Sequence, residues 1–242
     1  MRIKEITNYI EELAPLSYAE DFDNVGLLIG SYNSEVKGVL VTLDTLEETV
    51  DEAITKNCNL IISFHPIIFD GLKKINGNSY VERVAIKAIK NDIAIYATHT
   101  ALDNSRKGVS AKMCEIIGLV NTKILIPKKG IIKKLTTYVP TKDADSLRSS
   151  LFEVGAGDIG NYDQCSFNTS GESTFKGNQN SNPILGKKGK LHKEKETQIS
   201  LIFESKNETR ILNKLFEIHP YDEVSYELLT TQNEHQDIGI GM

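Results

Sequence analysis

The sequence has few cysteines, no long apolar run and no strong excess of charge, and each absence excludes a class of protein. Its three cysteines, Cys58, Cys114 and Cys165, are odd in number and more than 50 residues apart, so they form neither a disulfide framework nor a zinc ribbon. No apolar stretch approaches the roughly 18 residues of a transmembrane helix, and the N-terminus lacks the apolar segment of a signal peptide. These features predict a cytoplasmic protein without a membrane partner.

The chain also lacks a basic arm and an acidic tail. Its formal net charge of −5 over 242 residues argues against nucleic acid as a partner. Residues 187–195 hold five lysines, but glycine and glutamate interrupt them, which is typical of a solvated loop. With 40% apolar and 25% charged residues, the composition is that of a globular protein with a sizeable core.

The first half of the chain alternates between strand and helix patterns. Three near-continuous apolar runs predict buried strands at residues 38–43, 59–64 and 92–97. Apolar residues recur at helical spacing in 46–54 and 81–89, and Thr45 with Glu48 predicts a capping box at the start of the first of these helices. This half is therefore predicted to be α/β, with a mostly parallel sheet covered by helices on both faces.

The pattern changes at about residue 131, so we expect one domain over 1–131 and a second over 132–242. A strand–helix–strand unit occurs twice in the second domain, with strands expected at 134–139, 159–167, 198–203 and 223–229. This repeat is typical of the ferredoxin-like α+β fold. The polar stretch 168–195 between the repeats is expected to be a loop that includes a mobile excursion.

Two motifs in the second half have simple structural explanations. Residues 155–160 match G-x-G-x-x-G, but they follow a predicted helix and enter a strand, whereas the dinucleotide fingerprint leaves a strand and opens a helix. We interpret them as a helix C-cap followed by a turn. His219 followed by Pro220 is interpreted as a helix stop signal.

The candidate functional residues follow the three apolar strands of the first half. Asp44 follows the first strand, His65 follows the second, and His99 and Asp103 follow the third. The carboxyl ends of parallel strands form the ligand crevice of open α/β sheets. Imidazole and carboxylate groups at that edge suit a divalent metal or general acid/base chemistry.

Each of these residues also has a purely structural interpretation. His65, directly before Pro66, fits a hydrogen-bonded histidine at a turn as well as it fits a metal ligand. Asp103 fits the N-cap of the next helix. We assign Asp44 to a helix cap and His99 to a supporting or structural role. The sequence shows neither a Ser/His/Asp constellation nor a Walker motif.

Three stretches together resemble the Nif-three-like proteins, also called GTP cyclohydrolase I type 2 homologs. They are Ala19-Glu20-Asp21-Phe22-Asp23-Asn24-Val25-Gly26-Leu27, Ser63-Phe64-His65-Pro66-Ile67-Ile68-Phe69 and His99-Thr100-Ala101-Leu102-Asp103. The second half resembles the CutA/PII-like domain that is inserted in longer bacterial members. The segments that carry this second resemblance are residues 155–163, 189–191 and 219–223.

The resemblance implies a dinuclear centre of divalent metal ions, of the zinc, iron or manganese class, in a cytoplasmic homo-hexamer. It also implies a metal-dependent hydrolase acting on an unassigned small-molecule substrate. By the same resemblance, His65 and Asp103 are metal ligands. Phe64 stands where the family has a further ligand histidine and cannot bind a metal.

The resemblance further implies that a C-terminal His/Glu ligand pair is missing, so we expect a fragment or a truncated paralogue. Residues 1–131 would then be an incomplete, marginally stable α/β metal-binding domain, and 132–242 a ferredoxin-fold domain that folds autonomously. Two remaining ligands should hold a metal weakly, because catalytic sites usually have three. The alternative function is a non-catalytic regulatory or scaffold protein, whose PII-like domain mediates assembly or senses a small ligand.

Overall fold

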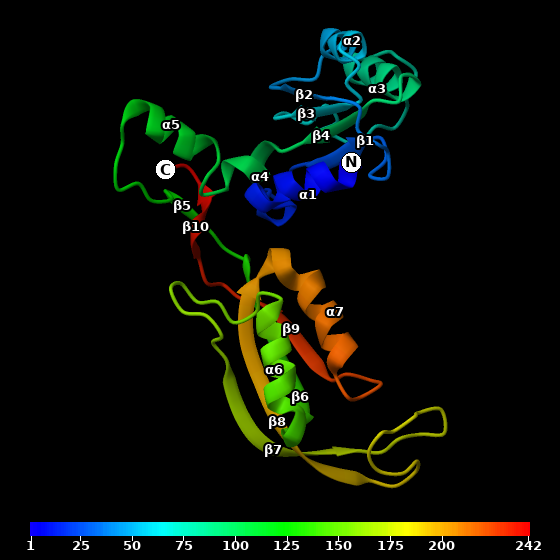
Figure 1. Ribbon diagram of the computed structural model, residues 1–242, viewed down its shortest axis with the longest axis vertical. Coiled ribbons are helices and arrows are strands. Elements are labelled where there is room, and N and C mark those ends of the chain that lie inside the picture. The colour runs from blue at the N-terminus through cyan, green and yellow to red at the C-terminus, as the bar shows by residue number, and fades with distance from the viewer. The chain divides into compact units, whose positions relative to one another are not determined.

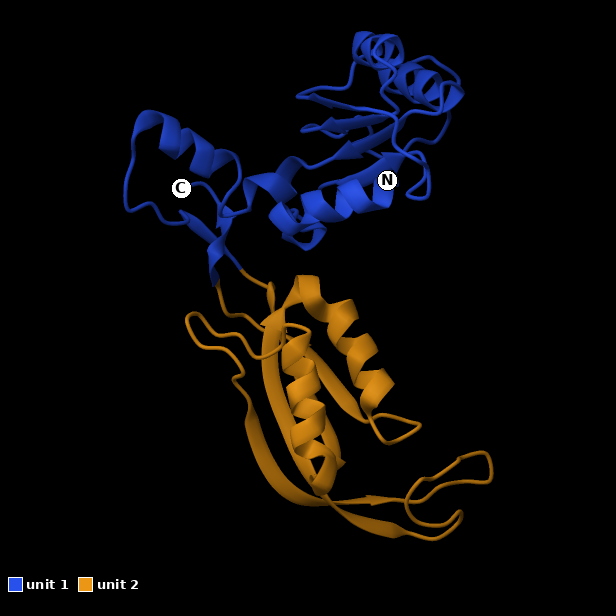
Figure 2. Ribbon diagram, in the orientation of Figure 1, with its two compact units in different colours: residues 1–128, 235–242 blue, residues 129–234 orange.

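The computed structural model describes residues 1–242, which form two compact units (Figures 1 and 2). Unit 1 contains residues 1–128 and 235–242, and unit 2 contains residues 129–234. The first boundary lies three residues from the expected one. Residues 235–242 were expected in the second domain, but they return to unit 1 because β10 (His235–Ile240) pairs antiparallel with β5 (Ile126–Lys128). None of the helices has the length and apolar character that crossing a membrane requires.

Unit 1 is built on a four-stranded sheet of order β1-β4-β3-β2. Strands β2, β3 and β4 are parallel, as expected, whereas β1 is an additional strand that runs antiparallel to β4. Unit 1 also contains five α-helices, the β5–β10 strand pair and a short 3₁₀ turn at Leu16–Tyr18. The bounds are α1 (Ile3–Leu13), β1 (Gly26–Ile29), β2 (Val39–Thr42), α2 (Glu47–Thr55), β3 (Leu60–Ser63), α3 (Tyr80–Lys90), β4 (Ala94–Ala97), α4 (His99–Asp103) and α5 (Val109–Ile117).

Helices cover both faces of this sheet, which confirms the predicted α/β class. The alternation of side chains along β3 and β4 divides their apolar residues between two cores. On one face, α2 and α3 bury Val50 and Val84 against Ile61 and Ile95. On the other face, Ile3 of α1 packs with Leu60, Ala94 and Tyr96.

The predicted capping box at Thr45 is wrong. Helix α2 begins at Glu47, and the Thr49 hydroxyl accepts a hydrogen bond of 3.2 Å from the backbone N–H of Leu46. Thr45 is buried, and its hydroxyl has no partner. The helix therefore starts later than the capping pattern suggested, because Thr49 caps it from within its first turn.

Unit 2 is a four-stranded antiparallel sheet of order β7-β8-β6-β9. Two strand–helix–strand repeats with this order give the ferredoxin-like plan, which confirms the predicted α+β class of the second half. Two 3₁₀ turns, Thr141–Asp143 and Ser205–Asn207, precede the helices. The bounds are β6 (Ile132–Pro140), α6 (Ala144–Glu153), β7 (Phe167–Phe175), β8 (His192–Glu204), α7 (Glu208–Ile218) and β9 (Tyr226–Thr230).

One continuous core joins the two helices of unit 2 to its central strands. Helix α6 contributes Leu147 and Leu151, and α7 contributes Ile211 and Leu215. These side chains pack against inward-facing residues of β6 and β8: Leu135, Val139, Ile199, Leu201 and Phe203. Residues 132–234 thus bury a core of their own within unit 2.

Two predictions about the middle of unit 2 are wrong. A strand was expected at residues 159–167, but β7 begins only at Phe167. Gly155, Gly157 and Gly160 have φ values of +88°, +85° and +57°, and the segment before β7 turns instead of extending. The polar stretch 168–195 was expected to be a loop, but it contains most of β7 and the start of β8. Strand β7 lies at the sheet edge with mostly exposed side chains, so its sequence does not alternate between apolar and polar residues. The interpretation of the glycines as a turn after a helix is confirmed.

Helix α7 ends where the His219-Pro220 motif predicted. His219 is its C-cap residue and is buried. The Nε2–H of His219 donates to the carbonyl of Tyr138 at 3.0 Å, and Nδ1 accepts from the N–H of Tyr221 at 3.1 Å. The neutral ring is thereby fully hydrogen-bonded. Burial lowers the pKa of His219 from its ordinary value of 6.5 and outweighs the hydrogen bond to Tyr138.

We expect unit 2 to lose stability as the pH falls below 6.5, the ordinary pKa of His219. Below pH 6.5, His219 takes up a proton in the unfolded chain but stays neutral in the folded chain. The contribution of the neutral ring to the free energy of unfolding is therefore complete above pH 6.5 and is lost on acidification. Urea unfolding of wild type and His219→Gln across this range measures the effect. At pH 8 the free energy of unfolding of the variant should be about 1 kcal/mol lower than that of the wild type, because the hydrogen bond to Tyr138 is lost. Its free energy of unfolding should also depend less on pH. Parallel losses in both proteins would refute this account.

Among the exposed apolar side chains of unit 1 are those of an edge strand and of a helix face. Val41 on the edge strand β2 is 75% exposed, and Ile116 and Ile117 on α5 are 73% and 69% exposed. An open strand edge and an uncovered apolar helix face both favour association with other chains.

We expect residues 129–234, expressed alone, to unfold in one cooperative thermal transition, because they contain the whole sheet and core of unit 2. Residues 1–131 alone should be marginally stable or aggregate, because β5 then lacks its partner β10 and the apolar side chains stay exposed. Circular dichroism melting curves of both pieces test this. A cooperative melt of 1–131 without aggregation would show that the prediction is wrong.

Candidate functional site

The candidate functional residues of the first half lie side by side at the carboxyl ends of β2, β3 and β4. Parallel pairing holds these strands in step to their last residues. Backbone hydrogen bonds then continue beyond the strands. The N–H of His65 donates to the carbonyl of Leu43 at 3.0 Å, and the N–H of His99 donates to the carbonyl of Phe64 at 2.9 Å.

Asp44 holds the imidazole of His65 instead of capping a helix with its side chain. Its Oδ1 lies 2.7 Å from His65 Nδ1, and both side chains are about half exposed. Because a carboxylate can only accept, Nδ1 carries a proton, and Nε2 has its lone pair in the neutral form of the ring. The structure thus places Asp44 in the site, which the sequence interpretation missed.

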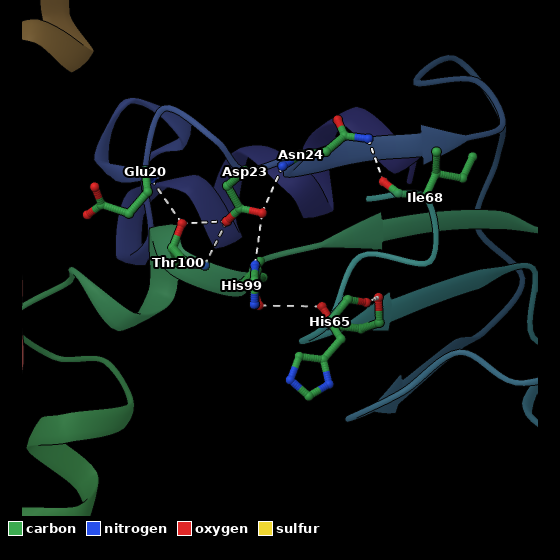
Figure 3. A network of polar contacts seen from close by, with 9 residues as sticks. Glu20, Asp23, Asn24, His65, Ile68, His99 and Thr100 are labelled. Carbon is green, nitrogen blue, oxygen red and sulfur yellow. Dashed lines mark hydrogen bonds and ion pairs between the residues drawn. The ribbon is translucent and has the colours of Figure 1, made fainter. Parts of the chain in front are cut away.

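Asp23 holds the second imidazole, that of His99, in the same way (Figure 3). The Asp23 Oδ1 lies 2.8 Å from His99 Nδ1, and the Asp23 side chain is fully buried. His99 has φ of +27°, a conformation that costs a non-glycine residue about 1–3 kcal/mol and needs support from its surroundings. Asp23 provides that support through the ring.

Three further hydrogen bonds converge on the Asp23 carboxylate. The N–H of Asn24 donates at 2.7 Å, the N–H of Thr100 donates at 3.1 Å, and the Thr100 hydroxyl donates as well. Burial opposes ionisation of Asp23, but the hydrogen bonds from Thr100 and His99 outweigh it and lower the pKa below its ordinary value of 3.8. Asp23 is therefore a buried, ionised anchor. Its position within the family-like motif was the available signal, but no role was assigned to it.

Aromatic rings surround the two imidazoles. The ring centroids of His65 and His99 lie 5.6 Å apart. The Phe64 ring contacts both, at 5.0 Å from His65 and 5.5 Å from His99, and the Phe69 ring lies 6.3 Å from His99. Phe64 thus contributes an apolar wall to the site.

Asp103 is the last residue of α4, four positions after His99 on the same helix. It does not cap the next helix, because Gly108 occupies the N-cap position of α5. Burial raises the pKa of Asp103 above 3.8, the charge of Asp23 adds to this, and His99 and His65 act in the opposite direction. Asp103 therefore shares an electrostatic environment with both imidazoles.

The donor groups suit a divalent metal in chemistry but do not enclose one. Two imidazoles with carboxylate-bound Nδ1 atoms are the usual arrangement of metal-binding histidines, and neither Nε2 atom has a hydrogen-bond partner. However, no three histidine, cysteine, aspartate or glutamate side chains meet in a way that could hold an ion. Figure 3 shows the His65 ring turned away from the Asp23 network. The residues thus form an open set of donors.

Sequence comparison relates the chain to a described family. The model of the Duf34/NIF3 (NGG1p interacting factor 3) family matches residues 1–218. The chain is 37% identical over 239 residues to the GTP cyclohydrolase 1 type 2 homolog of Bacillus subtilis, and 37% identical over 237 residues to that of Halalkalibacterium halodurans. Each alignment covers 98% of this chain and 64% of the relative. The chain therefore spans less than two thirds of the length of these relatives.

Solved structures give the same result. A Bacillus cereus protein related to NIF3 matches 99% of this chain with a TM-score of 0.76 and 36% identity, and 64% of that protein is covered. A Staphylococcus aureus protein matches 99% of this chain with a TM-score of 0.64 and 30% identity, and 62% of it is covered.

We expect Asp23→Asn to lower the free energy of unfolding of unit 1 by about 2–3 kcal/mol, because a buried charged acceptor of four hydrogen bonds is lost. Asp44→Asn is the matched control, since Asp44 also holds an imidazole Nδ1 but is half exposed. It should cost at most about 1 kcal/mol. Urea unfolding of both variants measures the difference, and equal losses would contradict the anchoring role of Asp23.

Proposed function

The chain belongs to the Duf34/NIF3 family, and from this membership and the geometry of its paired imidazoles we propose that His65 and His99, with the carboxylate of Asp103, contribute to an incomplete divalent metal site that these residues do not close on their own. The observation that carries the proposal is the carboxylate at each Nδ1: Asp44 beside His65 and Asp23 beside His99. Each carboxylate fixes the tautomer that directs the Nε2 lone pair to a metal and makes the ring a stronger ligand.

The reaction class that suits this site is hydrolysis. A divalent ion bound there would polarise a substrate oxygen and lower the pKa of a bound water. The protein's own contribution is to orient the donors: Asp23 fixes His99 within the fold, and Asp44 orients His65 at the surface. Asp103 would add a partly buried carboxylate from the same helix as His99.

The second candidate function is a non-catalytic regulatory or scaffold protein. Phe64 and the lack of any closed three-ligand group favour it. In that case unit 2 would mediate assembly or sense a small ligand, and the imidazole pair would be structural. Metal binding separates the two candidates, because only the first requires it.

We expect isothermal titration of the full chain with Zn²⁺ or Mn²⁺ to show saturable but weak binding, because catalytic sites usually supply three protein ligands in a closed arrangement. His65→Ala and His99→Ala should each abolish it. Asp44→Asn, which removes only the carboxylate behind His65, should weaken it about 10- to 100-fold.

His192→Ala in unit 2 is the control, because it removes an imidazole that is likewise paired with a carboxylate, Glu194. It should leave the titration unchanged. Full metal content in His65→Ala or His99→Ala would refute the ligand assignment. Loss of binding in His192→Ala would place the ion in unit 2.

A further inference from the structure

Unit 2 contains a cavity of about 580 Å³ that has no part in the site at the strand ends. This volume lies in the range of pockets that hold small organic molecules. Its walls come from β6 and β9, the β7–β8 hairpin and the segment after α7. The side chains that determine its chemistry are Tyr138, Phe175, Glu196, Tyr221, Asp222 and Glu227.

A buried carboxylate without a cationic partner lies in the wall of this cavity. Glu196 on β8 is only 6% exposed, and it forms no ion pair. Its side chain accepts a single hydrogen bond, of 2.7 Å, from the Tyr221 hydroxyl. Since an unpaired buried carboxylate is costly, such groups are normally matched by a cation. Glu196 has none within the chain.

Aromatic rings line the cavity beside this carboxylate. The Phe175 and Tyr221 rings lie 5.8 Å apart, and Tyr138 lies on β6 with its hydroxyl donating to Glu227 at 3.3 Å. Burial and the hydrogen bond to Glu196 raise the pKa of Tyr221, so it remains a neutral donor. Aromatic faces beside a carboxylate favour an organic cation, because they bind both its charge and its methylene groups.

The rest of the cavity wall is rich in carboxylates. Asp222, Glu223 and Glu227 also line the cavity, whereas Lys176 is the one basic residue that does so. Ser173 also lines the cavity, but its hydroxyl oxygen is fully buried and has no hydrogen-bond partner. The carboxylates stand on three separate segments, so a ligand with more than one positive group would match them.

We propose that this cavity binds an aliphatic diamine or polyamine, with one ammonium group at Glu196 and its methylene chain against Phe175 and Tyr221. The other ammonium group reaches the carboxylates of the segment after α7 and of β9. This site is independent of metal binding in unit 1, and it would make unit 2 a sensor of organic cations.

Isothermal titration of the full chain with putrescine and spermidine tests the proposal, at about 0.15 M salt so that non-specific attraction to the acidic protein is screened. We expect saturable binding. Glu196→Gln keeps the size of the side chain and an acceptor for Tyr221 but removes the charge, and should weaken binding at least tenfold. Glu172→Gln, in an exposed ion pair with Lys193 on the same hairpin, should leave it unchanged.

A titration of the wild type followed by NMR keeps the test decisive if Glu196→Gln does not fold. Signals of Tyr138, Phe175 and Tyr221 should shift together on adding putrescine, and the neutral diol analogue of putrescine should not shift them. Equal binding by the diol, equal affinities of Glu196→Gln and Glu172→Gln, shifts elsewhere in the chain, or no saturable binding at millimolar amine would each overturn the proposal. So would Mg²⁺ binding equally well at the same residues, since the site would then select for charge alone.

Discussion

The candidate site depends on the hydrogen bonds that the buried carboxylate of Asp23 accepts. This carboxylate accepts hydrogen bonds from Asn24, just before β1, and from His99 and Thr100, just after β4, so it links the two chain segments at one end of the β1–β4 pair. It also supports the left-handed backbone of His99. Without it, the strand ends could still align through the parallel sheet, but the second imidazole would lose its fixed orientation.

The sequence predicted those parts of the structure that follow from local patterns. The apolar runs of β2, β3 and β4 indicated a parallel sheet, and the repeated strand–helix–strand units indicated the ferredoxin-like plan; both are observed. The edge strand β7 was missed because pairing through its backbone requires no apolar alternation. The anchors of the site were missed for a different reason. Asp44 lies 21 residues from His65, and Asp23 lies 76 residues from His99, so only the folded chain brings them together.

Two buried carboxylates, Asp23 in unit 1 and Glu196 in unit 2, differ in the number of hydrogen bonds that they accept. Asp23 is fully hydrogen-bonded within the chain, which makes it a structural anchor. Glu196 has one neutral donor and faces a cavity, which leaves its charge available to a ligand. The same side-chain chemistry thus serves stability in unit 1 and recognition in unit 2. The ligand roles of His65 and Asp103 remain predictions that metal binding has to test.

The central claim is that two carboxylates hold His65 and His99 with Nδ1 protonated and Nε2 free to bind a metal. Long-range ¹H–¹⁵N correlation spectra of the imidazole rings test it most directly, because they distinguish the two tautomers at neutral pH. The account predicts the Nδ1–H tautomer for both rings, and a shift of both Nε2 resonances when Zn²⁺ is added. An Nε2–H tautomer at either ring, or Nε2 resonances that do not respond to Zn²⁺, would contradict it.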